Sequence, residues 1–220
     1  MIYQLSFGDL LPYWDVLAWG LAFTIVLTAV STVAGIGLGT ACAAARTFGP
    51  KWAGYAVSVY VELIRNTPFI VQLFFVFFGL PALGLKLTEA QAAFLAMVIN
   101  LGAYSMEIIR AGIEAVPKGH IEAGLSLAMS KGEIFRHIVL KQAFMKVYPA
   151  LSSQIIIVML GSAVVSQISA ADLTYAANFI QSRNFRAFEA YFAVAVLYLL
   201  LAIAMRALLR GIGRLAFPKV

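Results

Sequence analysis

The sequence predicts an all-α integral membrane protein that crosses the bilayer five times. Of its 220 residues, 62% are hydrophobic and 12% are charged, and its mean hydropathy is +0.91. Soluble domains are nearer half apolar and a quarter charged. Because a transmembrane helix needs about 20 mostly apolar residues, long uncharged runs indicate spans rather than a soluble core. The runs without an ionisable side chain are Val16–Ala45, Asn66–Leu85, Ala90–Met106, Val147–Ala171 and Ala190–Met205.

Each run corresponds to one expected helix. In the first, Gly35 and Gly39 form a Gly-x-x-x-Gly pair, which either admits a neighbouring helix closely or reflects the frequency of glycine in membrane helices. A short apolar stretch over residues 52–61 extends the second helix toward the N-terminus, and Pro68 is expected to kink it because proline lacks a backbone donor. The expected helices cover about residues 17–45, 53–80, 89–114, 147–169 and 188–210.

The net charge of +6 follows the expected topology rather than a nucleic-acid surface. Only Lys86, Arg183 and Arg186 lie on the side opposite the main basic group. Under the positive-inside rule the N-terminus is therefore outside and the C-terminus cytoplasmic. No basic residue precedes the first span, whose apolar run is too long for a cleaved signal peptide. The basic residues of the expected cytoplasmic side are Arg46, Lys51, Arg110, Lys118, Lys131, Arg136, Lys141, Lys146, Arg206, Arg210, Arg214 and Lys219.

The connection over residues 115–146 is too polar to span and too patterned for a linker. Ile121, Leu125 and Ala128 recur at about one helical turn and give an apolar stripe on a short helix. Ser130 followed by Glu133 is typical of a capping box that starts a second helix. From the pattern alone, these amphipathic helices could lie on the membrane, pack under the spans, or dock a cytoplasmic partner.

Four stretches of the chain resemble the permease subunits of ATP-binding-cassette importers, in particular the branch for polar amino acids of the histidine, glutamine and arginine type. Residues 122–130, Glu-Ala-Gly-Leu-Ser-Leu-Ala-Met-Ser, resemble the EAA loop of these permeases, and residues 62–68, 103–113 and 166–177 resemble other parts of the branch. The resemblance covers nearly the whole chain in order. Two positions depart from the pattern: Ala128 replaces a usual glycine and Lys141 a usual proline.

The resemblance implies a type I importer fold in the bacterial cytoplasmic membrane and a set of partners. A second permease subunit, identical or related, would pair with this chain, and two cytoplasmic ATPases would carry ATP and Mg. A substrate-binding protein would deliver the amino acid from outside. The sequence itself contains no Gly-x-x-x-x-Gly-Lys-Ser/Thr phosphate loop, so no cofactor is expected on this chain and the energy must enter from another.

In the family, the loop helix sits in a groove of the ATPase and moves with it. Ile121, Leu125 and Ala128 are the expected anchors. Glu122 is expected either to make a charged contact or only to favour the helix N-terminus, a local effect of about 0.3–1 kcal/mol. The expected coupling residues are Ile121, Glu122, Ala123, Gly124, Leu125 and Ala128.

Two Glu-x-x-Arg pairs are candidates for the substrate path, because ionisable residues inside spans are rare and costly. Glu62 with Arg65 is expected about 15 Å into the second span, near the midplane. Glu107 with Arg110 is expected almost at the cytoplasmic surface, in a structural or gating role. Arginine can bind a substrate carboxylate and glutamate its ammonium, but Glu62 and Arg65 could equally pair with each other or with neighbouring helices.

Other polar side chains at membrane depth could line a polar cavity or form hydrogen bonds between helices. These further candidates for the substrate path are Asn66, Thr67, Gln72, Asn100, Tyr104, Gln154, Ser162 and Ser166. The outer connection over residues 172–189, which contains Arg183 and Arg186, is either a contact for the binding protein or a solvated loop.

Two other functional classes agree less well with the sequence. A carrier or channel driven by an ion gradient often has internal repeats, and the five unequal spans show none. An intramembrane enzyme needs a catalytic constellation. His120 and His137 lie outside the expected spans, no His-Glu-x-x-His or Gly-x-Ser-x-Gly motif occurs, and Cys42 is the only cysteine. Neither catalytic residues nor a metal site is therefore expected.

Overall fold

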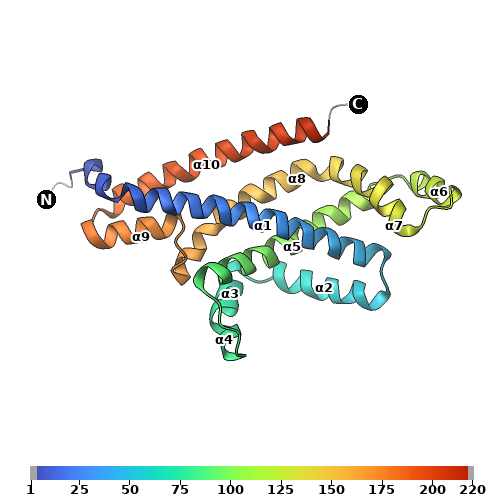
Figure 1. Cartoon of the computed structure of the whole chain (residues 1–220), viewed down its shortest axis with the longest axis horizontal. Helices are drawn as coiled ribbons and strands as arrows, with labels where there is room; N and C mark the ends of the chain where they lie inside the picture. The colour runs from blue at the N-terminus through green and yellow to red at the C-terminus, as the bar shows by residue number, and fades with distance from the viewer. Residues whose placement is uncertain (1–3, 218–220) are drawn as a thin grey trace. The chain divides into compact units, whose positions relative to one another are not determined.

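The computed structural model describes residues 4–217, and all regular structure in this range is helical, as the composition predicts. In chain order the helices are η1 (Phe7–Tyr13), α1 (Trp14–Phe48), α2 (Lys51–Arg65), α3 (Phe69–Phe74), η2 (Phe75–Gly79), α4 (Leu80–Ala82), α5 (Glu89–Glu114), α6 (Lys118–Ser126), α7 (Lys131–Glu133), η3 (Ile134–Val139), α8 (Leu140–Gly161), η4 (Ser162–Ile168), α9 (Leu173–Asn184) and α10 (Ala187–Ala216) (Figure 1).

Four helical runs among the described residues are long and apolar enough to cross a membrane, namely Phe7–Phe48, Glu89–Glu114, Lys131–Ile168 and Ala187–Ala216. The described residues contain a fifth candidate span if α2 and the helices from Phe69 to Ala82 are counted together as one broken span. The expected single helix over 53–80 is therefore interrupted. α2 ends at Arg65 and helix resumes at Phe69, because Pro68 has no backbone donor and disfavours helical geometry in the residue before it.

The fourth span begins earlier than its expected start at residue 147. Ser130 and Glu133 form the predicted capping box: the Ser130 N–H donates to Glu133 Oε2 at 2.8 Å, and the Glu133 N–H donates to Ser130 Oγ at 3.3 Å. Helix then continues from Lys131 into α8. Its buried residues are five apart across the π-helical η3, from Ile134 to Val139, and four apart from there to Leu151. The wider π turn keeps one apolar face in register.

The chain divides into two compact units of interleaved segments. The first comprises residues up to Ser31, Ile70–Met97 and Ile156–Leu208; the second comprises Thr32–Phe69, Val98–Ile155 and the residues from Leu209 onward. The start of α1, α9 and the start of α10 meet in the first unit. In the second, the end of α1, α2, most of α5 and the segments from α6 to α8 surround one apolar core.

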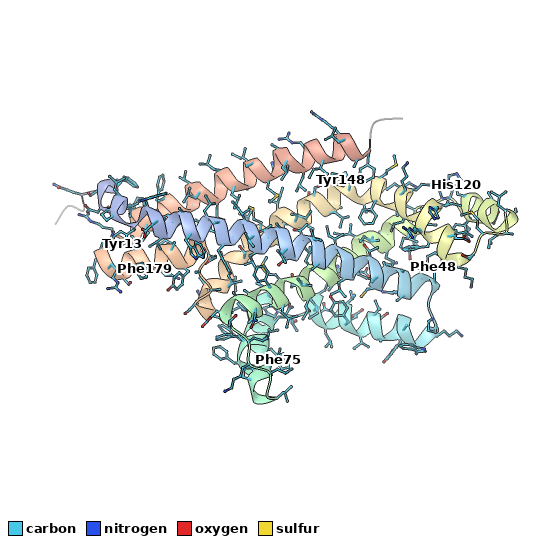
Figure 2. All side chains as sticks on the ribbon, in the orientation of Figure 1. Tyr13, Phe48, Phe75, His120, Tyr148 and Phe179 are labelled. Atoms are coloured by element: carbon cyan, nitrogen blue, oxygen red, sulfur yellow. The ribbon has the colours of Figure 1, made fainter. Side chains whose placement is uncertain are left out.

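The core of the first unit joins Leu10 of η1 to Leu173 and Ile180 of α9 and to Ala190 of α10. The rings of Tyr13 and Phe179, labelled in Figure 2, meet edge-on with centroids 6.5 Å apart. The outer connection expected over residues 172–189 is thus largely a helix rather than an extended loop.

Asp172 starts α9 and ties it to its neighbours in the first unit. Its Oδ1 accepts the Tyr175 N–H at 2.8 Å, and its Oδ2 accepts the Tyr198 hydroxyl at 2.9 Å. The Leu173 N–H donates to Thr24 Oγ1 of α1. The carboxyl is fully buried, and this burial raises the pKa of Asp172 to about 6. The capping residue thereby joins α9 to α10, and the Leu173 N–H joins α9 to α1.

In the second unit, α1 and α5 approach closely at glycines. A Cβ at Gly35 would lie 2.9 Å from the Leu101 side chain, and one at Gly39 would lie 2.7 Å from Ser105 Cβ. Gly102 of α5 is crowded in the opposite direction by Leu38 and the Tyr60 hydroxyl. The Gly-x-x-x-Gly pair therefore admits a neighbouring helix closely, rather than reflecting only the frequency of glycine in membrane helices.

The turn after α6 is a Schellman motif, a common helix ending closed by two reversed hydrogen bonds. The Met129 N–H donates to the Gly124 carbonyl at 3.1 Å, and the Ala128 N–H donates to the Leu125 carbonyl at 2.9 Å. Ala128 has φ +57°, the left-handed conformation in which glycine is favoured. The departure noted at Ala128 thus falls at the one position of the motif that disfavours a side chain.

We expect Gly39→Ala to lower the stability of the protein by about 1–3 kcal/mol, because the new methyl group would overlap Ser105 and the α5 backbone. Gly37→Ala on the same helix is the control, since a Cβ there meets none of the described residues within 4 Å. Thermal unfolding of the purified variants in detergent measures the difference. Equal melting temperatures would contradict the close approach of α1 and α5.

We expect Ala128→Gly to raise stability by up to about 1 kcal/mol, because it relieves the left-handed strain of a residue with a Cβ. Ala128→Val should have the opposite effect, since a branched side chain tolerates this conformation least. The same thermal measurement tests both variants. A destabilised Ala128→Gly protein would show that Ala128 is not held in this conformation in solution.

Candidate functional site

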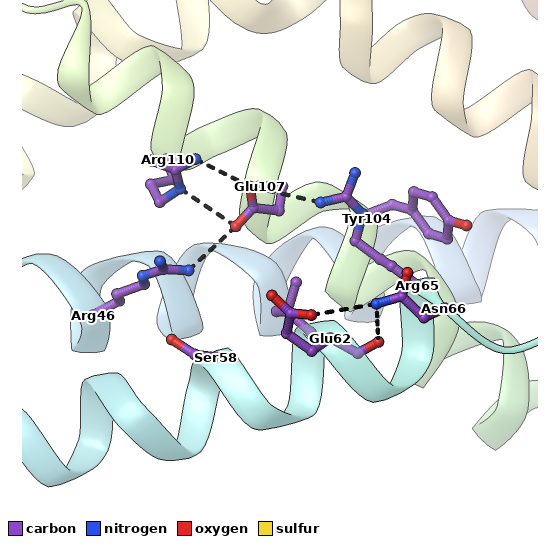
Figure 3. A pocket seen from close by; sticks show the side chains of 9 residues that line it. Arg46, Ser58, Glu62, Arg65, Asn66, Tyr104, Glu107 and Arg110 are labelled. Atoms are coloured by element: carbon purple, nitrogen blue, oxygen red, sulfur yellow. Dashed lines mark hydrogen bonds and ion pairs between the residues drawn. The ribbon is translucent and has the colours of Figure 1, made fainter.

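A polar pocket of about 400 Å³ opens in the second unit between the end of α1, α2 and α5 (Figure 3). Its wall has three arginines, two glutamates and four smaller or aromatic residues. The lining residues are Arg46, Ser58, Val61, Glu62, Arg65, Asn66, Tyr104, Glu107 and Arg110.

The carboxylate of Glu107 is the hub of this pocket. Its Oε1 accepts hydrogen bonds from Arg46 Nη1 and Arg110 Nε, both at 3.3 Å. Its Oε2 accepts one from Arg110 Nη2 at 3.1 Å and lies 3.6 Å from Arg65 Nη1. A carboxylate has about four lone-pair positions, so hydrogen bonds from Arg46 and Arg110 fill three of them, and Arg65 of α2 adds an ion-pair contact.

Arg65 is the least engaged of the three arginines. Its contact with Glu107 is the longest of the set, and its side chain is 42% exposed, against 28% for Arg110. Within residues 4–217 it donates no hydrogen bond, although its guanidinium lies over the Tyr104 ring, 5.6 Å from the centroid. The planar fork of an arginine with free donors is suited to a carboxylate ligand.

Glu62 lies on the same wall but does not pair with Arg65. Its Oε2 accepts the Asn66 side-chain amide at 3.3 Å, and in the part of the chain that the structure describes no cation lies within ion-pair distance. The alternative in which Glu62 and Arg65 pair with each other is therefore not adopted here. The two Glu-x-x-Arg pairs, expected at different depths, contribute to one pocket, because the Arg65 guanidinium and the Glu107 carboxylate come within 3.6 Å.

Four of the predicted path residues line this pocket: Glu62, Arg65, Asn66 and Tyr104. Thr67, Asn100 and Gln154 belong to the same unit but do not line it, and the Thr67 hydroxyl donates to the Leu63 carbonyl. Gln72, Ser162 and Ser166 are buried in the first unit. The Ser162 and Ser166 hydroxyls donate to carbonyls of their own helical run.

Sequence reasoning left five lining residues out of the predicted path: Arg46, Ser58, Val61, Glu107 and Arg110. Glu107 and Arg110 were assigned a structural or gating role, and Arg46 served only to orient the chain. The repetition of Glu-x-x-Arg on two helices was the available signal, because two such pairs can exchange partners when their helices are adjacent.

The predicted coupling helix is α6, and its two faces differ. Ile121 is half-buried and packs against the core of the second unit, and Gly124 is buried against Ile134 and Ile138. A Cβ at Gly124 would lie 2.9 Å from both of these isoleucines, which explains a glycine in the middle of a helix. Glu122, Ala123 and Ala128 are exposed. Leu125 and Leu127 are 54% and 76% exposed.

α6 is held on the remainder of the second unit by polar contacts as well. His120 Nδ1 lies 2.8 Å from Gln142 Oε1 of α8, and the Lys146 ammonium donates to the Ala115 carbonyl just before α6. Because these contacts hold α6 in place on its own chain, its exposed leucines form a surface suited to a partner protein.

The arginines of residues 172–189, the connection expected on the outer side, are engaged within the first unit. The Arg186 guanidinium contacts Asp9 Oδ2 at 3.2 Å and donates to the Gln4 carbonyl at 2.7 Å. Arg183 lies over the Phe179 ring, 5.2 Å from its centroid. The contacts of Arg186 tie the residues before η1 to the start of α10.

Among residues 4–217, no group of three or more His, Cys, Asp or Glu side chains could hold a metal ion.

Comparisons with known proteins agree with this architecture. Residues 35–216 match the family described as "Binding-protein-dependent transport system inner membrane component". The glutamine transport system permease protein GlnP of Escherichia coli (strain K12) is 34% identical, with 96% of this chain and 97% of the relative covered. The L-cystine transport system permease protein TcyB of Bacillus subtilis (strain 168) is 38% identical, with 78% and 74% covered.

A solved structure titled "Crystal structure of an amino acid ABC transporter with histidines" has a TM-score of 0.86 and 35% identity over 96% of this chain and 99% of the other. The resemblance drawn from the EAA-like loop and the other motifs is thereby confirmed, and nothing in these matches favours a carrier driven by an ion gradient. The chain belongs to the family of inner membrane components of binding-protein-dependent transport systems.

Proposed function

We propose that this chain is the permease subunit of an ATP-driven importer for a polar amino acid, which it passes across the membrane by alternating access. The observation that carries the proposal is the match over nearly the full chain to permeases named for amino acid transport. The pocket of the second unit supports it, because a guanidinium and a carboxylate on one wall suit the two charges of an amino acid.

The partners follow from the division of labour in such a system. Two permease subunits, identical or related, would form the path, two cytoplasmic ATPases would hold ATP and Mg, and a binding protein would deliver the substrate from outside. The basic residues favour an outer N-terminus and a cytoplasmic C-terminus. This orientation puts α6 on the side of the ATPases and α9 on the side of the binding protein.

We assign the coupling of ATP hydrolysis to transport to α6. Its exposed face would enter a groove of the ATPase with Leu125, Leu127 and Ala128, and Glu122 would lie at the rim. Its buried face, with Ile121 and Gly124, would transmit the movement to the start of the fourth span, since Gly124 contacts Ile134 and Ile138 directly. A helix can transmit displacement only if both of its faces are held.

We propose the pocket residues Glu62, Arg65, Asn66 and Tyr104 as direct contacts of the substrate. Thr67, Gln72, Asn100, Gln154, Ser162 and Ser166 remain proposed members of the path on the sequence argument. The hydroxyls of Ser162 and Ser166 would have to leave their carbonyl acceptors to bind substrate.

If the chain is the permease subunit of an importer, uptake should depend both on ATP and on the binding protein. Proteoliposomes would hold this chain with its co-purifying membrane and ATPase subunits, with ATP inside and the binding protein outside. We expect uptake of a labelled amino acid only when both are present, because energy and substrate selection enter from other chains. Uptake that persists without ATP and without binding protein would contradict the proposal and indicate a gradient-driven carrier.

The coupling role predicts that Leu127→Asp uncouples the transporter, because a carboxylate would be buried unpaired in an apolar groove. We expect loss of most ATP-dependent uptake and weaker co-purification of the ATPase. Leu85→Asp is the matched control, since Leu85 is also well exposed, at 60%, but precedes α5 at the opposite end of that helix from Glu114. Equal ATPase recovery and uptake for the two variants would argue against docking through α6.

A further inference from the structure

We propose that the pocket between α1, α2 and α5 is a subsite for the zwitterionic head of an amino acid and that it discriminates against cationic side chains. Arg65 would bind the α-carboxylate and Glu62 the α-ammonium. This inference rests on the proposed amino acid importer and narrows its substrate class, because the relatives and the solved structure are named for glutamine, cystine, arginine and histidine.

The carboxylate would go to Arg65 because the other two guanidinium groups are committed. Arg110 donates two hydrogen bonds to Glu107 and also pairs with Glu114. Arg46 donates to Glu107 at 3.3 Å. Among residues 4–217, Arg65 makes one ion-pair contact, at 3.6 Å, and donates no hydrogen bond, so a ligand carboxylate could take its donors without breaking a hydrogen bond. Tyr104 keeps the guanidinium plane in place while it does so.

The ammonium would go to Glu62 because three guanidinium groups already surround the second carboxylate of the pocket, Glu107. Both oxygens of Glu107 are shared among three arginines, and a cation placed there would meet their charge. Glu62 accepts only the Asn66 amide and its backbone position is fixed one turn before Arg65. Residues three apart on a helix present their side chains to the same side, which suits a ligand with adjacent opposite charges.

The charged groups of the pocket also determine which substrate side chains it accepts. A zwitterion uses the one free guanidinium and the one free carboxylate. A lysine or arginine side chain would bring a second cation, for which the described pocket offers no further carboxylate and three nearby guanidinium groups. A neutral polar side chain meets no such penalty and can use the hydroxyl of Ser58 or Tyr104. Specificity of this kind arises mainly from penalties against the wrong ligand.

Binding to the purified permease–ATPase complex in nanodiscs, without binding protein, tests this inference. Labelled glutamine would be displaced by unlabelled neutral, acidic and basic amino acids. We expect arginine and lysine to compete at least about tenfold more weakly than glutamine, because their second cation meets the arginine charges of the pocket wall. Equal competition by basic and neutral amino acids, or no binding at millimolar glutamine, would overturn the proposal.

Variants separate the roles of the two residues. Arg65→Gln and Glu62→Gln should each weaken glutamine binding about tenfold or more, whereas Arg65→Lys should keep part of the affinity. Arg214→Gln is the matched control, because Arg214 is exposed near the end of α10 and does not line the pocket. Unchanged binding in both Arg65→Gln and Glu62→Gln would contradict the assignment.

Ser58→Asp tests the explanation of specificity through a gain of arginine binding rather than a loss of glutamine binding. A new carboxylate in the wall should raise the ratio of arginine to glutamine binding about tenfold, a result that misfolding cannot produce. An unchanged ratio in a variant that still assembles with the ATPase would refute the explanation of specificity.

ATP-dependent uptake tests the importer role separately from this subsite. If the wild-type system shows normal ATP-dependent uptake and the pocket variants do not change it, the importer role stands and this subsite is rejected.

Discussion

Glu107 binds three guanidinium groups from three helices, and the arrangement of the second unit depends on this one carboxylate. Arg46 lies in the last turn of α1, Arg65 ends α2, and Arg110 lies one turn beyond Glu107 on α5. Charged side chains in an apolar environment are costly unless they are paired. Without the carboxylate, three positive charges would face one another across the pocket. The same shared pairing leaves Arg65 only loosely bound, so a site that stabilises the helices can also offer a free guanidinium to a ligand.

Close packing of α1 on α5 makes this charge cluster possible. Gly35 and Gly39 on one helix and Gly102 on the other leave no room for a side chain at their contacts, so the helix backbones approach closely. The Tyr60 hydroxyl of α2 donates to the Ile99 carbonyl at 2.6 Å and holds α2 against α5. Small residues thus set the distance between the helices, and the arginine side chains then span what remains between their ends.

α6 shows how one short helix can serve two partners. Gly124 and Ile121 hold it on the core of its own chain, whereas Leu125 and Leu127 face outward. The turn through Ala128 leads directly to the capping box at Ser130, so the exposed helix and the start of the fourth span are separated by only a few residues. A displacement of α6 would therefore act on a continuous helix that begins at Lys131 and whose π-helical turn η3 lies close to that start.

The sequence by itself determined the helical class, the family and many of the helix limits. The third span was expected over 89–114 and is observed at Glu89–Glu114, and the capping box at Ser130 was read correctly. These features depend on local composition and on neighbours within one helical turn, which a sequence displays directly. Tertiary structure decided the rest. Spacing within a helix paired Glu62 with Arg65, but a long arginine side chain can choose among carboxylates on adjacent helices, and Arg65 lies against Glu107 instead. Apolar periodicity likewise marked Ile121 and Leu125 as equivalent anchors, although one faces the core and the other is exposed. Only the packing of separate helices distinguishes a buried apolar face from one that awaits a partner, because both have the same pattern in the sequence.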